Sequence, residues 1–304
     1  MTFPADRPGG PRPAAIRAGC PLARCVPGPS LACALFLSIG RVGAPGADLA
    51  AQQLQDNSFL IEEAYNQDRG MVQEINGFAR GSGGRDWVYL FTQEWPLGGV
   101  RHQLSYSVPI EHHEGFRTTG LGDLLVHYRY QAVGRGSEAR LFFAPRLSLL
   151  LPTGRPASGR GAGSVGVQTN LPLTLAVTPR LATHWNAGLT LVPSAQDPAG
   201  ESATTLASNL GASAVWYFRP LINPLVELIW TRQQGVTGPG RTVASSSAFL
   251  NPGLRWAVNL PRRVQITVGA AYTIALNRND DDGVFLYLSF EHPFRRLTSE
   301  EAAR

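Results

Sequence analysis

The chain has little of what a helical or disulfide-bonded membrane protein needs. Only 16% of its 304 residues are charged, and no stretch approaches the roughly 18 consecutive apolar residues that a membrane-spanning helix requires. A helical transporter is therefore excluded. The three cysteines, Cys20, Cys25 and Cys33, all lie near the start. The rest of the chain has no thiol with which to form a disulfide or bind a metal, as expected of an exported protein that loses its leader.

Lysine is absent, so all 27 basic residues are arginine. The net charge is +5, but the arginines are scattered and form no basic run. This distribution argues against a nucleic-acid partner.

Glycine and proline are abundant, with 33 and 23 residues, and they lie largely between short apolar stretches. That arrangement is typical of an all-β protein.

The first 46 residues have the features of a secretory signal peptide. Arg17 and Arg24 precede a short apolar segment, 31–39, and the small residues Ala44 and Gly46 follow it. The apolar segment is too short to cross a bilayer, so we expect cleavage near Ala47.

Beyond the leader, apolar and polar residues alternate along one segment after another. In 166–177, Val167, Leu171 and Leu175 share one face, whereas Gln168 and Asn170 share the other. Side chains of a β-strand alternate between its two faces, so one face of each strand contacts an apolar phase and the other a polar one.

Twelve segments are expected to be strands, and most have ten residues or more. Strands of soluble proteins average about five or six residues, whereas a tilted membrane-crossing strand needs about nine to eleven. The predicted strands are 71–79, 87–95, 101–110, 123–132, 140–151, 166–177, 181–191, 204–218, 221–231, 248–260, 264–276 and 284–294.

The links between these segments alternate in length, as in outer-membrane barrels with short periplasmic turns and longer outer loops. Short links are expected at 96–99, 134–137, 178–179, 219–220 and 261–263, and long ones at 80–86, 111–121, 152–164, 193–203, 232–247 and 277–283. This alternation predicts an even strand number and places both termini in the periplasm. Aromatic residues near strand ends, Trp95 and Trp216 among them, suit interfacial girdles.

The fold class predicted is therefore all-β, a closed antiparallel transmembrane β-barrel of about 12 strands over residues 70–294. Residues 47–69 are expected to form a periplasmic segment or a small hatch in the barrel mouth, and 295–304 a polar tail. The inward positions should line the lumen, and they are Arg101, Asp123, His127, Arg129, Arg140, Arg146, Gln168, Asn170, His184, Asn186, Asn209, Glu227, Asn251, Arg255 and Gln265.

Three short motifs, in 56–67, 92–97 and 102–106, carry a resemblance to a known family. They read Asp-Asn-Ser-Phe-Leu-Ile-Glu-Glu-Ala-Tyr-Asn-Gln, Thr-Gln-Glu-Trp-Pro-Leu and His-Gln-Leu-Ser-Tyr. With them, the chain resembles, from Asp56 to Phe294, outer-membrane barrels described as transporters of the meta-pathway of phenol degradation. The resemblance implies a barrel fold and the transport of aromatic compounds. The chain departs from barrels that finish on a terminal aromatic, because ten residues follow Phe294.

Other motifs have simpler explanations. Glu111-His-His-Glu114 lacks two histidines one helical turn apart and is expected to be a solvated loop, not a metal site. The G-x-G-x-x-G match in 161–166 precedes a strand, and the acidic run 279–283 lacks spaced calcium ligands. Asp123 and His127 lie on one face but about 13 Å apart at 3.3 Å per residue, too far to form a catalytic pair.

The function predicted is passive passage of small compounds, aromatic or apolar ones among them, across the outer membrane. No enzyme activity, cofactor or metal is expected. The partners expected are outer-membrane lipid and lipopolysaccharide, the barrel-assembly machinery and a small-molecule solute. The alternatives are an outer-membrane hydrolase with an active site at the rim and a closed structural barrel.

Overall fold

A computed structural model describes residues 58–134, 139–219, 221–278 and 280–294. The predicted signal peptide, 1–46, and the predicted tail, 295–304, lie outside these residues, as does the 47–57 part of the predicted N-terminal segment.

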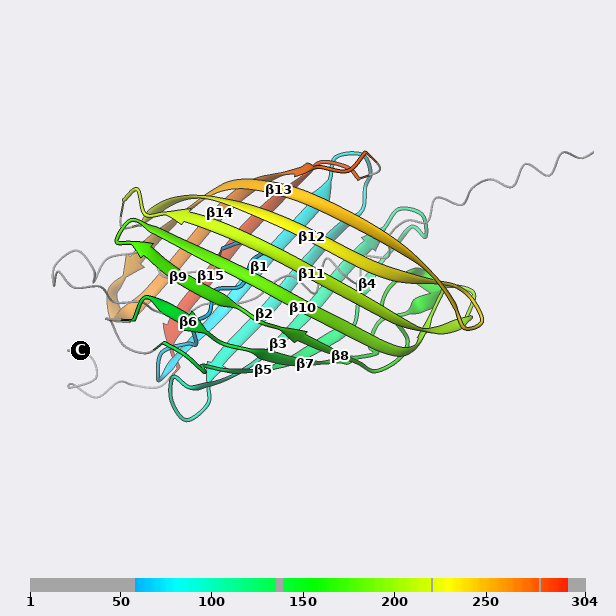
Figure 1. Ribbon diagram of the computed structural model, residues 1–304, viewed down its shortest axis with the longest axis horizontal. Coiled ribbons are helices and arrows are strands. Elements are labelled where there is room, and N and C mark those ends of the chain that lie inside the picture. The colour runs from blue at the N-terminus through cyan, green and yellow to red at the C-terminus, as the bar shows by residue number, and fades with distance from the viewer. Residues whose placement is uncertain (1–57, 135–138, 220, 279, 295–304) are drawn as a thin grey trace, which may run out of the picture.

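One antiparallel sheet closes on itself to form a barrel (Figure 1). Strand β1 (Met71–Gly81) pairs along its whole length with β15 (Gly283–Pro293), so that Met71 lies opposite Pro293 and Gly81 opposite Gly283. Closure gives the first and last strands a partner on both sides. A sheet in hydrocarbon needs this because water is absent there to satisfy an open edge.

The remaining strands follow one another around the wall. In chain order they are β2 (Trp87–Pro96), β3 (His102–His113), β4 (Thr118–Leu121), β5 (Leu124–Tyr130), β6 (Leu141–Phe143), β7 (Arg146–Leu151), β8 (Gly166–Asn170), β9 (Leu173–Thr178), β10 (Leu181–Gln196), β11 (Ser202–Trp216), β12 (Ile222–Gly238), β13 (Arg241–Leu260) and β14 (Val264–Ala275). Two short 3-10 turns, η3 (Pro156–Ser158) and η4 (Pro261–Arg263), complete the elements.

Three neighbouring barrel strands are each interrupted once, between β4 and β5, β6 and β7, and β8 and β9. The barrel therefore has twelve strands, as the sequence predicts. Pro145 and Pro172 lie in two of the gaps, and they are nearly opposite each other because Arg146 pairs with Asn170 and Phe143 with Leu173. Proline has no N–H to donate, so the ladder breaks there while the side-chain alternation continues.

The barrel has two distinct edges. The turn edge carries the links 97–101, 131–140, 179–180, 217–221 and 261–263, together with the two ends of the wall, Met71 and Pro293. The loop edge carries the links 82–86, 114–117, 152–165, 197–201, 239–240 and 276–282.

The predicted long link 232–247 is wrong. Strands β12 and β13 continue through it as a hairpin, paired up to Gly238 and Arg241 (Figure 1). The hairpin extends past β14, whose pairing ends at Ala275, while β11 runs beside it and Ser202 O accepts the Gly240 N–H. The prediction fails because this part of the two strands is mostly polar and so lacks the apolar–polar alternation that marks the rest of the wall. Gly238 and Gly240 have positive φ, 148° and 63°, and make the tight turn.

The burial pattern of the wall is the reverse of that in a soluble protein. Large apolar side chains face outward, and Leu189, Leu210 and Leu228 are 53%, 54% and 50% exposed. Glu227 and Arg255, on the inner face, are fully buried. Exposed apolar patches of this extent mark a surface that water does not cover, which in a closed barrel is the lipid face.

Aromatic residues lie at the ends of outward-facing rows. Trp216 and Phe218 pack edge to face at 5.3 Å near the turn edge, and Trp256 is also exposed. Amphipathic rings prefer the membrane–water interface. Within the described ranges, no helix has the length and apolar character needed to span a membrane.

We expect the Leu210→Arg variant, with a charge midway along β11, to lower the free energy of unfolding in lipid by about 2–4 kcal/mol. The control is Val243→Arg, since Val243 is similarly exposed, at 50%, but lies on the part of the hairpin that extends past β14. Guanidinium titration of refolded barrels in phospholipid vesicles measures both. Equal losses in the two variants would argue against a lipid-facing wall.

Candidate functional site

A chain segment that is not part of the wall fills the turn-edge half of the barrel. This plug segment, residues 58–69, precedes β1 and lies among inward-facing side chains of strands from around the barrel. Most of its residues are buried, and Ser58, Glu62 and Ala64 are fully so. The segment reaches β1 through Gly70, whose φ of 79° turns the chain, and the Met71 N–H donates to Asp68 O.

Side chains of the wall bind the backbone of the plug segment. An extended segment without a neighbouring strand must have its buried N–H groups satisfied in another way. The acceptors are Glu227 Oε1 for Leu60 and Ile61 (2.7 and 2.9 Å), Asn186 Oδ1 for Glu62 (2.9 Å), Thr174 Oγ1 for Ala64 (2.9 Å) and Gln103 Oε1 for Gln67 (2.7 Å).

Carbonyl groups of the plug segment are bound in the same way. Arg129 donates to the carbonyl oxygens of Glu63 and Tyr65 and, through Nε, to Asn66 Oδ1 at 2.8 Å. Gln131 donates to Ala64 O and Asn186 to Glu62 O, each at 2.8 Å. The wall thus replaces a sheet partner for the segment.

Two adjacent acids of the plug segment neutralise arginines of the wall. Glu62 Oε1 lies 2.9 Å from Arg146 Nη2, and Glu63 Oε1 lies 3.3 Å from Arg255 Nη1 and 3.5 Å from His184 Nε2. All these side chains are at most 1% exposed. An unpaired buried charge is costly, so the pairs favour the docked segment over any arrangement that leaves the arginines alone.

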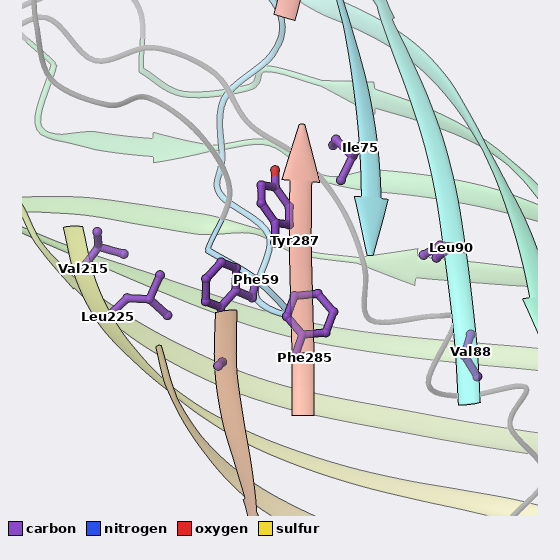
Figure 2. Close-up of a cluster of buried hydrophobic side chains, with 9 residues drawn as sticks. Phe59, Ile75, Val88, Leu90, Val215, Leu225, Phe285 and Tyr287 are labelled. Carbon is purple, nitrogen blue, oxygen red and sulfur yellow. The ribbon is translucent and has the colours of Figure 1, made fainter. Parts of the chain in front are cut away.

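Two apolar side chains of the plug segment fit against glycines of the inner wall. The ring of Phe59 lies over Gly253 and Gly269, and Ile61 lies over Gly211; a Cβ at any of these glycines would collide with the side chain above it. Figure 2 shows Phe59 beside Phe285 and Tyr287 of β15. The three rings form part of a buried cluster with Ile75, Val88, Leu90, Val215, Leu225 and Ala271. The inner wall is therefore apolar in one sector, although the alternation predicts a polar face throughout.

The half of the interior near the loop edge is organised by Asp123. Its carboxylate accepts N–H groups of Gly154 at 3.0 Å and Ala162 at 2.6 Å, and Gln196 N donates to Ala162 O at 2.8 Å. The link 152–165 is thereby held to the wall. Ala162 also packs against a small buried cluster of Leu125, Leu150, Val192 and Ala195.

His127 lies between two serines rather than near Asp123. Its Nε2 is 3.0 Å from Ser107 Oγ and its Nδ1 2.7 Å from Ser148 Oγ. A serine beside a histidine suggests a nucleophile and its base, but here both ring nitrogens contact hydroxyls instead of an orienting carboxylate. Ser107, His127 and Ser148 are at most 2% exposed, so the group serves the packing of the wall.

The Glu111–Glu114 motif belongs partly to a strand, because β3 extends to His113, and the prediction of a loop is wrong there. Alternation sends Glu111 and His113 to the buried face, 3.5 Å apart, and leaves His112 on the outer face, stacked on Trp87. Within the described part of the chain, no group of three or more His, Cys, Asp or Glu side chains could hold a metal ion.

Most of the residues predicted to line the lumen lie on the inner face. The buried ones are Asp123, His127, Arg129, Arg146, Gln168, Asn170, His184, Asn186, Glu227, Asn251 and Arg255, while Asn209 and Gln265 are half-buried. Arg101 and Arg140 are exposed instead, because each precedes the first residue of its strand and lies in a link at the turn edge.

Several inward residues are missing from the predicted lumen lining. Glu94 is one of them, and it accepts a hydrogen bond from Gln103 Nε2 at 2.8 Å across the β2–β3 hairpin. Thr92 and Glu94 are two residues apart in the predicted strand 87–95 and so share its polar face, which is the signal that would have identified Glu94 as inward-facing. Glu62 and Glu63 have no comparable signal, because the plug segment has no repeating period.

Comparisons with known proteins find similarity of structure only. No protein-family model and no curated protein sequence matches the chain. The KdgM porin in complex with oligogalacturonate is 9% identical, covers 74% of this chain and 99% of its own, and has a TM-score of 0.41. The β domain of the Bordetella autotransporter BrkA is 14% identical, with coverages of 74% and 98% and a TM-score of 0.41. The Pseudomonas putida toluene transporter TodX is 9% identical, with coverages of 74% and 88% and a TM-score of 0.33. These TM-scores are all below 0.5, so the barrel fold is established by the strand pairing described above and not by the comparisons.

The Glu62→Gln variant should loosen the plug segment, since it leaves Arg146 buried without its carboxylate, a loss of about 3–5 kcal/mol in docking free energy. Hydrogen exchange of peptides covering 58–69 should accelerate, while exchange of the wall strands stays slow. The control, Asp68→Asn, removes a half-exposed pair with Arg263 at 3.4 Å, worth about 0–1 kcal/mol. Unchanged protection in Glu62→Gln would mean that the pair does not hold the segment.

Proposed function

We propose that the chain is an outer-membrane channel through which small compounds pass passively, with the plug segment as its movable obstruction. One observation carries this proposal: the turn-edge half of the space inside the closed wall is filled by residues 58–69, which are held by hydrogen bonds and ion pairs. Such contacts can be broken without breaking the wall.

The size of the barrel supports a passage over a solid structural barrel. About eight strands leave an interior that wall side chains alone can fill, whereas this wall of twelve encloses a whole chain segment as well. A purely structural barrel of this width would more simply fill its interior with side chains of the wall strands. The plug segment instead enters from the turn edge, next to β1, and can withdraw by the same route.

The apolar sector around Phe59 supports small aromatic or apolar compounds as the solutes. In this sector the inner wall is lined by apolar side chains, and an uncharged ring already lies against them. The resemblance to phenol-degradation transporters agrees with this substrate class.

The leader-like start and the membrane-spanning wall support an outer-membrane location. We assign the turn edge, with both ends of the wall, to the periplasm, because short turns face that side in such barrels. The expected partners follow from this location: lipopolysaccharide, the barrel-assembly machinery and a solute, with no cofactor or nucleic acid. His184 does lie between a hydroxyl, Thr174 Oγ1 at 2.8 Å, and a carboxylate, Glu63 Oε1 at 3.5 Å. All three side chains are at most 1% exposed, so a substrate would not reach the hydroxyl while the plug segment is docked, and we do not assign a hydrolase.

A disulfide between the plug segment and the wall tests the proposal. Ser58 Oγ and Ser213 Oγ lie 2.5 Å apart, and the chain has no cysteine after Cys33, so Ser58→Cys/Ser213→Cys forms a single reducible lock. Proteoliposomes carrying the oxidised double variant should admit arabinose and benzoate about tenfold more slowly than the reduced protein, because the lock removes the open population.

The Ser58→Cys single variant serves as the control, since its permeation should not respond to reduction. Equal permeation in the two redox states of the double variant would mean that the plug segment does not gate a path. No permeation in either state, from a barrel with heat-modifiable mobility on gels, would count against a channel.

A further inference from the structure

The apolar niche that holds Phe59 has the features of a ligand site that is occupied by the chain itself. Its floor is made by Gly253 of β13 and Gly269 of β14, the two positions where a Cβ would meet the Phe59 ring. Its side is made by Phe285 and Tyr287, whose ring centroids lie 5.4 and 5.6 Å from that of Phe59 at tilts of 50° and 44°. These distances and tilts are favourable for aromatic pairs.

The niche is shaped for one ring. Two adjacent strands each lack a side chain at the point where the ring lies, and Ala271, between Gly253 and Phe285 in the strand register, is also small. Phe59 is 2% exposed, and the side chains of its cluster are apolar apart from the hydroxyls of Tyr287 and Tyr217. A charged ligand would lose its hydration there without a compensating partner, so the site selects uncharged molecules.

The inward positions of the wall between the niche and the loop edge carry small side chains. Beyond Phe285, the inward positions of β14, β15 and β1 carry only Thr273, Ala275, Gly283, Gly81 and Ala79. Of these only Gly283 is buried, whereas the other four are partly exposed. In this sector the wall therefore contributes little side-chain volume on the loop-edge side of the niche, whereas the plug segment is bound on the turn-edge side.

We propose that the Phe59 niche binds a small uncharged aromatic compound, of the size of benzene or toluene, and that the Phe59 ring is its place-holder. The compound enters past the small side chains on the loop-edge side and takes the position of the ring, so its binding and the docking of Phe59 exclude each other. This site rests on the proposed function, for which it names the substrate class and the point of contact.

The mutual exclusion is measurable in the intact chain. With 4-fluorophenylalanine at position 59, fluorine NMR in detergent micelles should show a single resonance of a buried ring. Titration with toluene should replace it, saturably, by the resonance of a solvent-exposed ring, whereas arabinose should have no effect. A resonance that does not change up to the solubility of toluene would overturn the proposal.

Removal of the place-holder should strengthen binding. Because the ligand no longer competes with a docked ring, Phe59→Ala should bind toluene about tenfold or more tightly than the native chain. Phe59→Ala/Gly269→Leu should lose this gain, since the leucine fills the vacated space from the wall. Crystals of Phe59→Ala soaked in bromobenzene should show bromine between Gly253 and Phe285.

Any dry apolar cavity of this size can bind benzene. A second Phe→Ala variant elsewhere in the barrel therefore serves as the control for specific binding in the Phe59 niche. Phe142 is equally buried, at 2%, and packs edge to face on Tyr65 in a separate cluster. Phe142→Ala should gain no comparable affinity, and an equal gain would overturn the proposal. Arabinose entry in the disulfide assay does not depend on this niche. If arabinose still enters the proteoliposomes but toluene does not bind, the proposed channel is supported and the proposed aromatic site is wrong.

Discussion

The absence of water from the bilayer is the constraint on which the rest of this molecule depends. Each backbone N–H and C=O of a strand in hydrocarbon must find a partner in another strand, and only a closed sheet provides one for all of them. The pairing of β1 with β15 supplies that closure. It also determines the side chains, because the outer face contacts lipid and most large polar residues in the middle of the strands therefore lie inside.

An interior of this kind creates a second requirement. Arg129, Arg146 and Arg255 all project inward and are buried. The plug segment contributes Glu62 and Glu63 to Arg146 and Arg255, and backbone carbonyls to Arg129. The segment and the wall therefore complement each other: the wall binds the backbone of a segment that has no sheet partner, and the segment supplies acceptors to buried arginines of the wall.

Sequence periodicity predicts the wall well because lipid on one face imposes a strict pattern. The strand number, the closed topology and the inward positions of residues such as His127, Gln168 and Asn251 all follow from it. The pattern fails where the constraint is absent. The end of the β12–β13 hairpin is mostly polar and has no apolar–polar alternation. Pro145 and Pro172 interrupt the strand pairing, but the side chains before and after them still alternate between the inner and outer faces.

Contacts between distant segments are the least predictable part. Nothing local in the sequence indicates that Glu63 meets Arg255, that Phe59 lies over Gly253 and Gly269, or that His127 contacts Ser107 and Ser148. These contacts depend on which strands face one another across the barrel, and that arrangement appears only when the sheet has closed. Glycine on the inner face of a strand is a usable signal, since it marks a place where another group approaches closely.

The position of the plug segment at the start of the wall has a consequence for the order of folding. Its partners come from β3, β5, β7, β10, β12 and β13, so it has nowhere to dock until nearly the whole chain has been delivered and the last strand has joined the first. Pairing across so long a stretch of chain is slow because of the loop entropy involved. The plug segment, which precedes the wall in the chain, is therefore the last part to reach its native position. Until then the turn-edge half of the assembling barrel has no plug segment inside it.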